Sequence, residues 1–257
     1  MMRVSLYFTP HQTDEFALRN QIVVVIDVLR AGTSITTALS NGAKEIIPVT
    51  TVERAVKISG SLFGDYILRG GERNGKMIEG FNLGNSPADY SEEKVRGKAI
   101  IYSSTNGSRA IDKARYAREM VVCAFVNISA VVEFLAGQQG DIHVVCAGNN
   151  GTFSMEDSVC AGMLLHKMAE DRGVDISFSD AGLATVALFK SFGRSIPKML
   201  KNSEHGRFLA QIGFAADLEA CSSVDTLAVV PQLVGNVIKL KREPEKQKAA
   251  KVNVPIQ

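Results

Sequence analysis

Three segments of this sequence repeat one order: an apolar run, a loop of small polar residues, and the start of a helix. The runs are Gln21–Val28 (QIVVVIDV), Ala99–Tyr102 and His143–Cys146, and the loops that follow them are Leu29–Ser34, Ser103–Gly107 and Ala147–Ser154. The β-branched residues of the first run are typical of a central strand in a parallel sheet. Strands that alternate with helices of crossover length predict a three-layer α/β/α fold around a mostly parallel sheet, with mixed pairing allowed at its edge.

The length of 257 residues suits one large domain or two small ones. We assign residues 1–241 to a single α/β catalytic domain, with two lobes around a central cleft as the alternative. The stretch from Lys241 onward is charged and contains proline. It predicts a surface tail over residues 242–257.

Composition argues against several classes of partner. Lys and Arg number 29 against 27 Asp and Glu, a net charge of +2 that gives no basic field for nucleic acid. No run approaches the roughly 18 apolar residues of a membrane span, and the first residues lack an apolar signal segment. We therefore expect no membrane association and a cytoplasmic location. A homo-oligomer is compatible with all of this.

The 4 cysteines show no CxxC spacing, so neither a zinc site nor a redox pair is indicated. Cys123 and Cys146 lie in apolar runs, and we expect both in the core.

Other segments carry weaker signals. The stretch Arg69–Tyr90 holds five glycines, three asparagines and one proline among several apolar residues, which predicts a packed functional loop. Asp217–Ser222 and Thr226–Val230 are predicted as the last edge elements of the sheet. Pro231–Leu240 is predicted as a closing helix.

The three repeated loops are expected to meet at one edge, because ligands of such folds bind beyond the carboxyl ends of the strands. A loop that opens a helix offers free backbone N–H groups to an anion. The alternative for Ser103–Ser108 is a loop that only caps a crossover helix. In the third repeat, Ser154 and Asp157 match a helix-capping pattern, which gives Asp157 a structural alternative as well.

This edge would gather carboxylates and arginines. The carboxylates are Asp27, Glu72, Glu156 and Asp157, and the arginines are Arg30, Arg73, Arg109 and Arg207. Such a set suits a hard divalent cation together with a phosphate-bearing substrate. No P-loop, dinucleotide fingerprint, Cys-x5-Arg loop or Asp-x-Asp loop is present, and metal-assisted phosphate ester hydrolysis remains.

Five blocks of the sequence resemble the 2-phosphosulfolactate phosphatase family. They are IDVLRAGTSITTAL, GGERNGKMIEGFNLGNSPADY, SSTNGSRA, CAGNNGTFSMEDSVCAGMLLHK and EHGRFLAQIGFAADLEAC, in the same order from about Ile22 to Pro231. The resemblance implies a magnesium-dependent phosphatase that converts 2-phospho-3-sulfolactate to 3-sulfolactate and phosphate. It also implies a place in coenzyme M biosynthesis.

On this basis we assign roles to the residues. Asp27, Arg30 and Glu156 are the expected catalytic group. The expected Mg²⁺ ligands are Asp27, Glu72, Glu156 and, more weakly, Asp157. The substrate-binding residues are expected to be Ser104, Thr105, Asn106, Gly107 and Arg109 around the phosphate, Arg30 and Arg207 at the sulfonate or carboxylate, and Asn149 and Asn150 on the third loop.

Several readings stay open from the sequence. The attacking group is either Asp27 itself or a water held by the metal. His205 is either a proton donor to the leaving oxygen or an exposed loop residue. A phosphatase for another small phosphorylated hydroxy acid, and a non-catalytic protein that binds an anionic metabolite, are the two alternative functions.

Overall fold

The computed structural model describes residues 1–61 and 66–240. The predicted tail, residues 242–257, lies outside the described residues. The strands are β1 (Met2–Tyr7), β2 (Ile22–Ile26), β3 (Glu45–Pro48), β4 (Ile67–Arg73), β5 (Lys76–Met77), β6 (Ala99–Ser103), β7 (Glu119–Cys123), β8 (Ile142–Cys146), β9 (Ile176–Phe178), β10 (Pro231–Val234) and β11 (Val237–Leu240). The helices are α1 (Ala31–Ser40), α2 (Val52–Ser61), α3 (Glu92–Val95), α4 (Gly107–Lys113), α5 (Ile128–Ala136), α6 (Met155–His166), α7 (Asp180–Phe192), α8 (Ile196–Asn202), α9 (Glu204–Gln211) and α10 (Ala215–Ser222).

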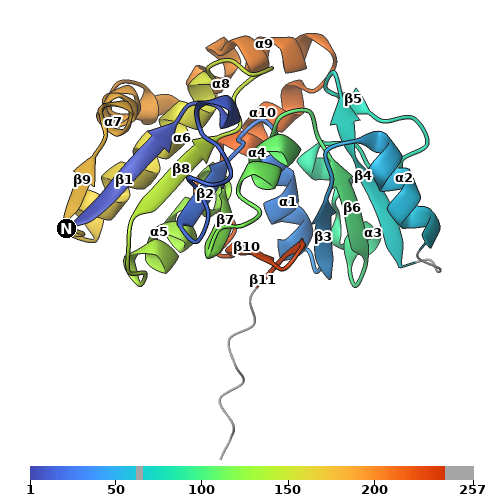
Figure 1. Ribbon diagram of the computed structural model, residues 1–257. Coiled ribbons are helices and arrows are strands. Elements are labelled where there is room, and N and C mark those ends of the chain that lie inside the picture. Colours follow the sequence, from blue (N-terminus) through green and yellow to red (C-terminus); the bar gives the residue numbers. More distant parts are fainter. Residues whose placement is uncertain (62–65, 241–257) are drawn as a thin grey trace, which may run out of the picture.

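Within the described residues, eleven strands form one sheet in the order β5–β4–β6–β3–β11–β10–β7–β2–β8–β1–β9 (Figure 1). β2 lies at the centre of one parallel block, paired in register with β7 on one side and β8 on the other. A second parallel block joins β3, β6 and β4. The predicted α/β fold with a mostly parallel sheet is confirmed.

Helices cover both faces of this sheet, as the alternation along β2 shows. Val24 packs in a core cluster with residues of α5 and α6, whereas Val23 and Val25 pack in a second cluster with residues of α1. Successive side chains of a strand point to opposite faces, so each face has its own apolar layer. Cys123, Cys146 and Cys160 are fully buried in these clusters, as expected for reduced core cysteines.

The sequence prediction was wrong for the end of the chain. Pro231–Leu240 forms the antiparallel hairpin β10–β11 rather than a helix, and this hairpin lies between β3 and β7 in the middle of the sheet. Mixed pairing is therefore not limited to the edge. Asp217–Ser222 belongs to helix α10, and Thr226–Val230 forms no strand.

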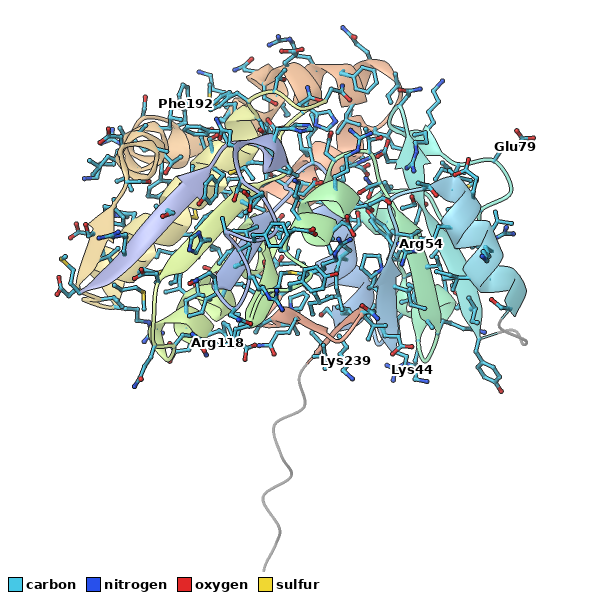
Figure 2. The ribbon with its side chains drawn as sticks, viewed as in Figure 1. Lys44, Arg54, Glu79, Arg118, Phe192 and Lys239 are labelled. Carbon is cyan, nitrogen blue, oxygen red and sulfur yellow. The ribbon has the colours of Figure 1, made fainter. Side chains whose placement is uncertain are left out.

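Charged side chains such as Lys44, Glu79 and Arg118 point outward from the fold (Figure 2). None of the helices in the described part of the chain is long and apolar enough to cross a membrane.

Candidate active site

Asp27 follows the last residue of β2 and is buried at the carboxyl edge of the sheet. Its Oδ1 accepts a hydrogen bond of 3.0 Å from the backbone N–H of Ala31, in the first turn of α1. Burial raises its pKa to about 7, while His205 and the Ala31 N–H lower it and Glu72 and Glu156 raise it further. Near neutral pH this carboxyl group can therefore be present in both protonation states.

Gly107 lets the start of α4 approach Asp27 closely. A Cβ at this position would lie 2.6 Å from Asp27 Oδ2 and 2.6 Å from the Cβ of Ala31. Any side chain would displace one of these groups. Oδ2 of Asp27 therefore faces the β6–α4 loop across a glycine.

The β6–α4 loop caps its own helix. The Ser104 N–H donates to Ser108 Oγ at 2.8 Å, and the Ser108 N–H donates to Ser104 Oγ at 3.0 Å. This is the capping role that the sequence left as the alternative. The hydroxyl of Thr105, in contrast, is buried without a hydrogen-bond partner among the described residues. A buried hydroxyl without a partner at a cavity is suited to a ligand oxygen.

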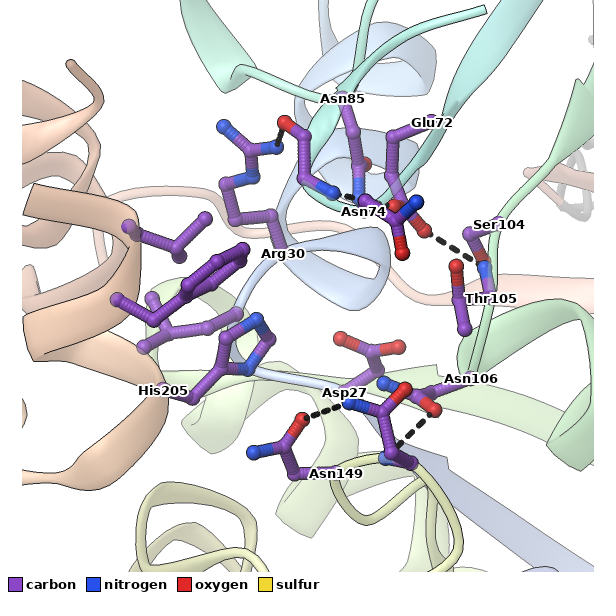
Figure 3. Close-up of a pocket in the computed structure, with 15 residues that line it drawn as sticks. Asp27, Arg30, Glu72, Asn74, Asn85, Ser104, Thr105, Asn106, Asn149 and His205 are labelled. Atoms are coloured by element: carbon purple, nitrogen blue, oxygen red, sulfur yellow. Dashed lines mark hydrogen bonds between the residues drawn. The ribbon is translucent and has the colours of Figure 1, made fainter. Parts of the chain in front are cut away.

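Glu72, at the end of β4, joins two loops of the site. Its Oε1 accepts from the Thr105 N–H at 2.6 Å, and its Oε2 accepts from the Gly75 N–H at 2.9 Å (Figure 3). Both carboxylate oxygens are thus bound to backbone. The predicted functional stretch Arg69–Tyr90 does line the cavity, but its first residues continue β4 instead of forming a loop.

The third repeated loop, between β8 and α6, completes the rim. Asn149 and Asn150 both line the cavity, and the Asn150 N–H donates to Asn106 Oδ1 at 3.1 Å (Figure 3). The loops that follow β2, β6 and β8 therefore converge around one cavity, as predicted for the three repeated loops, and the turn after β4 joins them. Its lining residues are Asp27, Leu29, Arg30, Glu72, Asn74, Gly75, Asn85, Ser104, Thr105, Asn106, Asn149, Asn150, His205, Phe208 and Leu209.

The sequence model of the 2-phosphosulpholactate phosphatase family matches residues 7–236. The chain belongs to this family. It is 38% identical over 242 residues to a probable 2-phosphosulfolactate phosphatase of Caldanaerobacter subterraneus subsp. tengcongensis, covering 94% of this chain and 100% of that protein. A probable 2-phosphosulfolactate phosphatase of Thermotoga maritima is 42% identical over 221 residues, which cover 86% of this chain and 92% of that protein.

Three arginines were expected to bind substrate, and one of them, Arg30, lines the cavity. Arg30 is buried, with Nη1 2.6 Å from Asp217 Oδ2 and Nη2 donating to the Gly75 carbonyl at 2.5 Å. Its guanidinium carbon lies 4.2 Å from the ring centre of Phe214. Arg109 is exposed and lines a neighbouring cavity instead. Arg207 is exposed and donates to the Asn202 carbonyl.

The four predicted metal ligands do not form one cluster. Asp157 Oδ1 accepts from the Val28 N–H at 2.8 Å and Oδ2 accepts from the Gly148 N–H at 3.0 Å, so this carboxylate joins two loops. Glu156 Oε1 lies 3.4 Å from His205 Nδ1. In residues 1–61 and 66–240, no group of three His, Cys, Asp or Glu side chains is placed to hold a metal ion.

The residues of this cavity still fit a magnesium ion. Mg²⁺ is commonly held by one or two carboxylates and keeps several waters. Oδ2 of Asp27 accepts no hydrogen bond in the described residues, and amide oxygens of asparagines line the same cavity. The donor set is therefore all oxygen, as a hard cation requires.

His205 was an open candidate from the sequence, whereas Asn74 of the cavity wall and Asp217 beside Arg30 were missed. His205 was left with an exposed alternative, yet its side chain is only 15% exposed and comes from α9. Asn74 is in the tight β4–β5 turn with φ 52°, and Asp217 reaches Arg30 from α10. The Asn-Gly pair at Asn74 was the available signal for a turn, whereas nothing local links Asp217 to Arg30.

Proposed function

We propose that this chain hydrolyses 2-phospho-3-sulfolactate to 3-sulfolactate and phosphate. The proposal rests on a buried carboxylate oxygen, Asp27 Oδ2, and the hydroxyl of Thr105, which has no hydrogen-bond partner among the described residues. Both lie at one cavity at the carboxyl edge of the sheet. A phosphoester oxygen accepts from such a hydroxyl. The names of both relatives, probable 2-phosphosulfolactate phosphatases, support the same substrate.

Magnesium is part of the proposal. When bound, the ion would neutralise phosphate oxygens and lower the pKa of a bound water. Asp27 is the residue that we propose to hold it. Glu72 supports the site differently, because it fixes the Thr105 and Gly75 backbone at the cavity wall.

The rest of the substrate would lie toward Arg30. The guanidinium of Arg30 is fixed by Asp217 and by stacking on Phe214. Little conformational entropy of this side chain is therefore lost when it binds the substrate. Asp217 is held in turn by the Ser86 hydroxyl at 2.6 Å. Arg30 keeps further N–H groups for the substrate's carboxylate or sulfonate.

The position of Arg109 and Arg207 favours a second candidate. Of the arginines expected to bind substrate, Arg30 alone is among the residues that line the cavity. The site therefore offers less positive charge for a sulfonate than the sequence implied. Another small phosphorylated hydroxy acid is the alternative substrate. A cytoplasmic location and a homo-oligomeric state stay predictions.

The decisive experiment measures phosphate release from racemic 2-phospho-3-sulfolactate, with Mg²⁺ and then with EDTA. We expect release that requires Mg²⁺ and that falls by at least about a thousandfold in Asp27→Asn. Asp171→Asn, which alters an exposed carboxylate outside the cavity, is the matched control and should leave the rate unchanged.

Release that survives EDTA would contradict the magnesium proposal. An equal rate with 2-phospholactate would move the assignment to the broader substrate class. No release from either ester would remove the phosphatase assignment and favour a protein that only binds anions.

A further inference from the structure

Glu156 is a buried carboxylate that lies beside His205. It lies in the first turn of α6 with its side chain 2% exposed. Across the described part of the chain, His205 is the basic side chain within ion-pair distance, with Nδ1 3.4 Å from Oε1. A buried carboxylate is costly unless a cation compensates it, and His205 is the side chain placed to do so.

His205 is held from several sides at the mouth of the cavity. Ser203 caps α9 by accepting from the Gly206 N–H at 3.0 Å, which fixes the turn that carries the imidazole. The ring stacks on Phe208, with 6.3 Å between ring centres and 29° between planes. Figure 3 shows the imidazole directed from α9 into the cavity toward Asp27.

The charged groups around the imidazole are few. Glu156 faces it from α6, and Asp27 faces it from the end of β2. On α9 itself, Glu204 and Arg207 are exposed. Because Nδ1 is the ring nitrogen beside Glu156, we assign Nε2 as the nitrogen available to the cavity.

We infer that His205 is a catalytic residue that protonates the leaving oxygen through Nε2–H, and that Glu156 is the positioning residue that orients it. The inference rests on the proposed function. It also gives Glu156 a different task from the metal ligand that the sequence suggested.

In the proposed step, water hydrolyses a phosphate monoester. The water oxygen forms a bond to phosphorus, and the bond between phosphorus and the ester oxygen breaks with its electron pair on that oxygen. The Nε2 proton passes to the ester oxygen, which leaves as the hydroxyl of the hydroxy acid. A proton of the attacking water passes to solvent, and the imidazole regains its proton from solvent. An alkoxide is a poor leaving group, so the donor matters for this substrate.

The test is His205→Gln on 2-phospho-3-sulfolactate, with the kinetic isotope effect of ¹⁸O at the ester bridge as the second readout. We expect kcat to fall by roughly 100- to 10,000-fold with KM little changed. We also expect a larger isotope effect, because the oxygen then leaves without a proton to offset its lost bond. Glu156→Gln should lower kcat by roughly 10- to 100-fold and raise the isotope effect less.

His166→Gln is the matched control, since His166 lies on α6 with its ring against Phe189, outside the cavity. It should leave kcat and the isotope effect unchanged. Thermal melting of each variant verifies folding.

A loss of kcat in His205→Gln of less than about tenfold would overturn the inference. So would a large loss with an unchanged isotope effect, because that pattern belongs to a residue that only shapes the site. If the wild-type chain releases no phosphate at all, the proposed function fails and this inference fails with it.

Discussion

Asp27 and Asp157 are both buried at the carboxyl edge of the sheet, and burial raises the pKa of each. They differ in what their oxygens do. Both oxygens of Asp157 accept backbone N–H groups and thereby join the β2–α1 loop to the β8–α6 loop. Asp27 binds backbone with Oδ1 and turns Oδ2 to the cavity. A raised pKa therefore marks both residues, whereas the unengaged oxygen distinguishes the one available for chemistry.

The largest expected effect is on the free energy of unfolding, which substitution of Asp27 should raise and substitution of Asp157 should lower. Burial raises the Asp27 pKa from 3.8 to about 7, so its stabilising contribution is complete below pH 4 and is lost as pH rises through 7. An asparagine side chain does not ionise, so Asp27→Asn removes this loss of stability at high pH. We expect its free energy of unfolding at pH 8, in EDTA, to exceed that of the wild type by about 4 kcal/mol.

Urea denaturation at several pH values measures this difference. It should shrink toward zero as the pH falls well below the unfolded pKa of 3.8, where the wild-type carboxyl group is protonated in both the folded and the unfolded state. A difference that stays constant with pH would mean that Asp27 does not titrate as its burial implies.

Asp157→Leu is expected to act in the opposite direction. It leaves the N–H groups of Val28 and Gly148 without acceptors, and each unsatisfied group costs about 1–3 kcal/mol. Loss of a buried carboxylate offsets part of this, so we expect a net destabilisation of about 3 kcal/mol. Thermal and urea unfolding measure it. Asp157→Asn, which keeps one acceptor, should lose less, and an equal loss would argue against the bridging role.

The smallest effect concerns the helix that carries Asp157. Ser154 caps α6 by accepting from the Asp157 N–H at 3.2 Å. Ser154→Ala should lower the free energy of unfolding by about 1 kcal/mol and leave kcat for phosphate release unchanged. A fall in kcat without a fall in stability would show that this turn positions the catalytic residues as well.

The repeated strands and loops were predictable because their signals are local. The β-branched run of β2 and the polar loops after β2, β6 and β8 fixed both the fold class and the edge at which the cavity lies. The hairpin was missed although Val234, Gly235, Asn236 and Val237 have the two-residue Gly-Asn turn typical of one.

The details of the site depend on contacts between distant parts of the chain. Arg30 and Asp217 are 187 residues apart, and Glu156 meets His205 from another helix. The sequence showed that Glu72 and Asp157 are acidic, but not that backbone N–H groups already occupy their oxygens. The magnesium ion and the individual ligands stay predictions.

The hairpin β10–β11 also determines when the fold can be completed during synthesis. It is the seam between the two parallel blocks, touching β7 through the pair Gln232↔Val121 and β3 through Ile238↔Ile46. Asp27 belongs to one block, whereas Glu72 and Ser104 belong to the other. During synthesis the blocks emerge first, each with an open strand edge, and Pro231–Leu240 must leave the ribosome before the edges are joined. Chains stopped before Pro231 would therefore hold every cavity residue and still lack the element that brings them together.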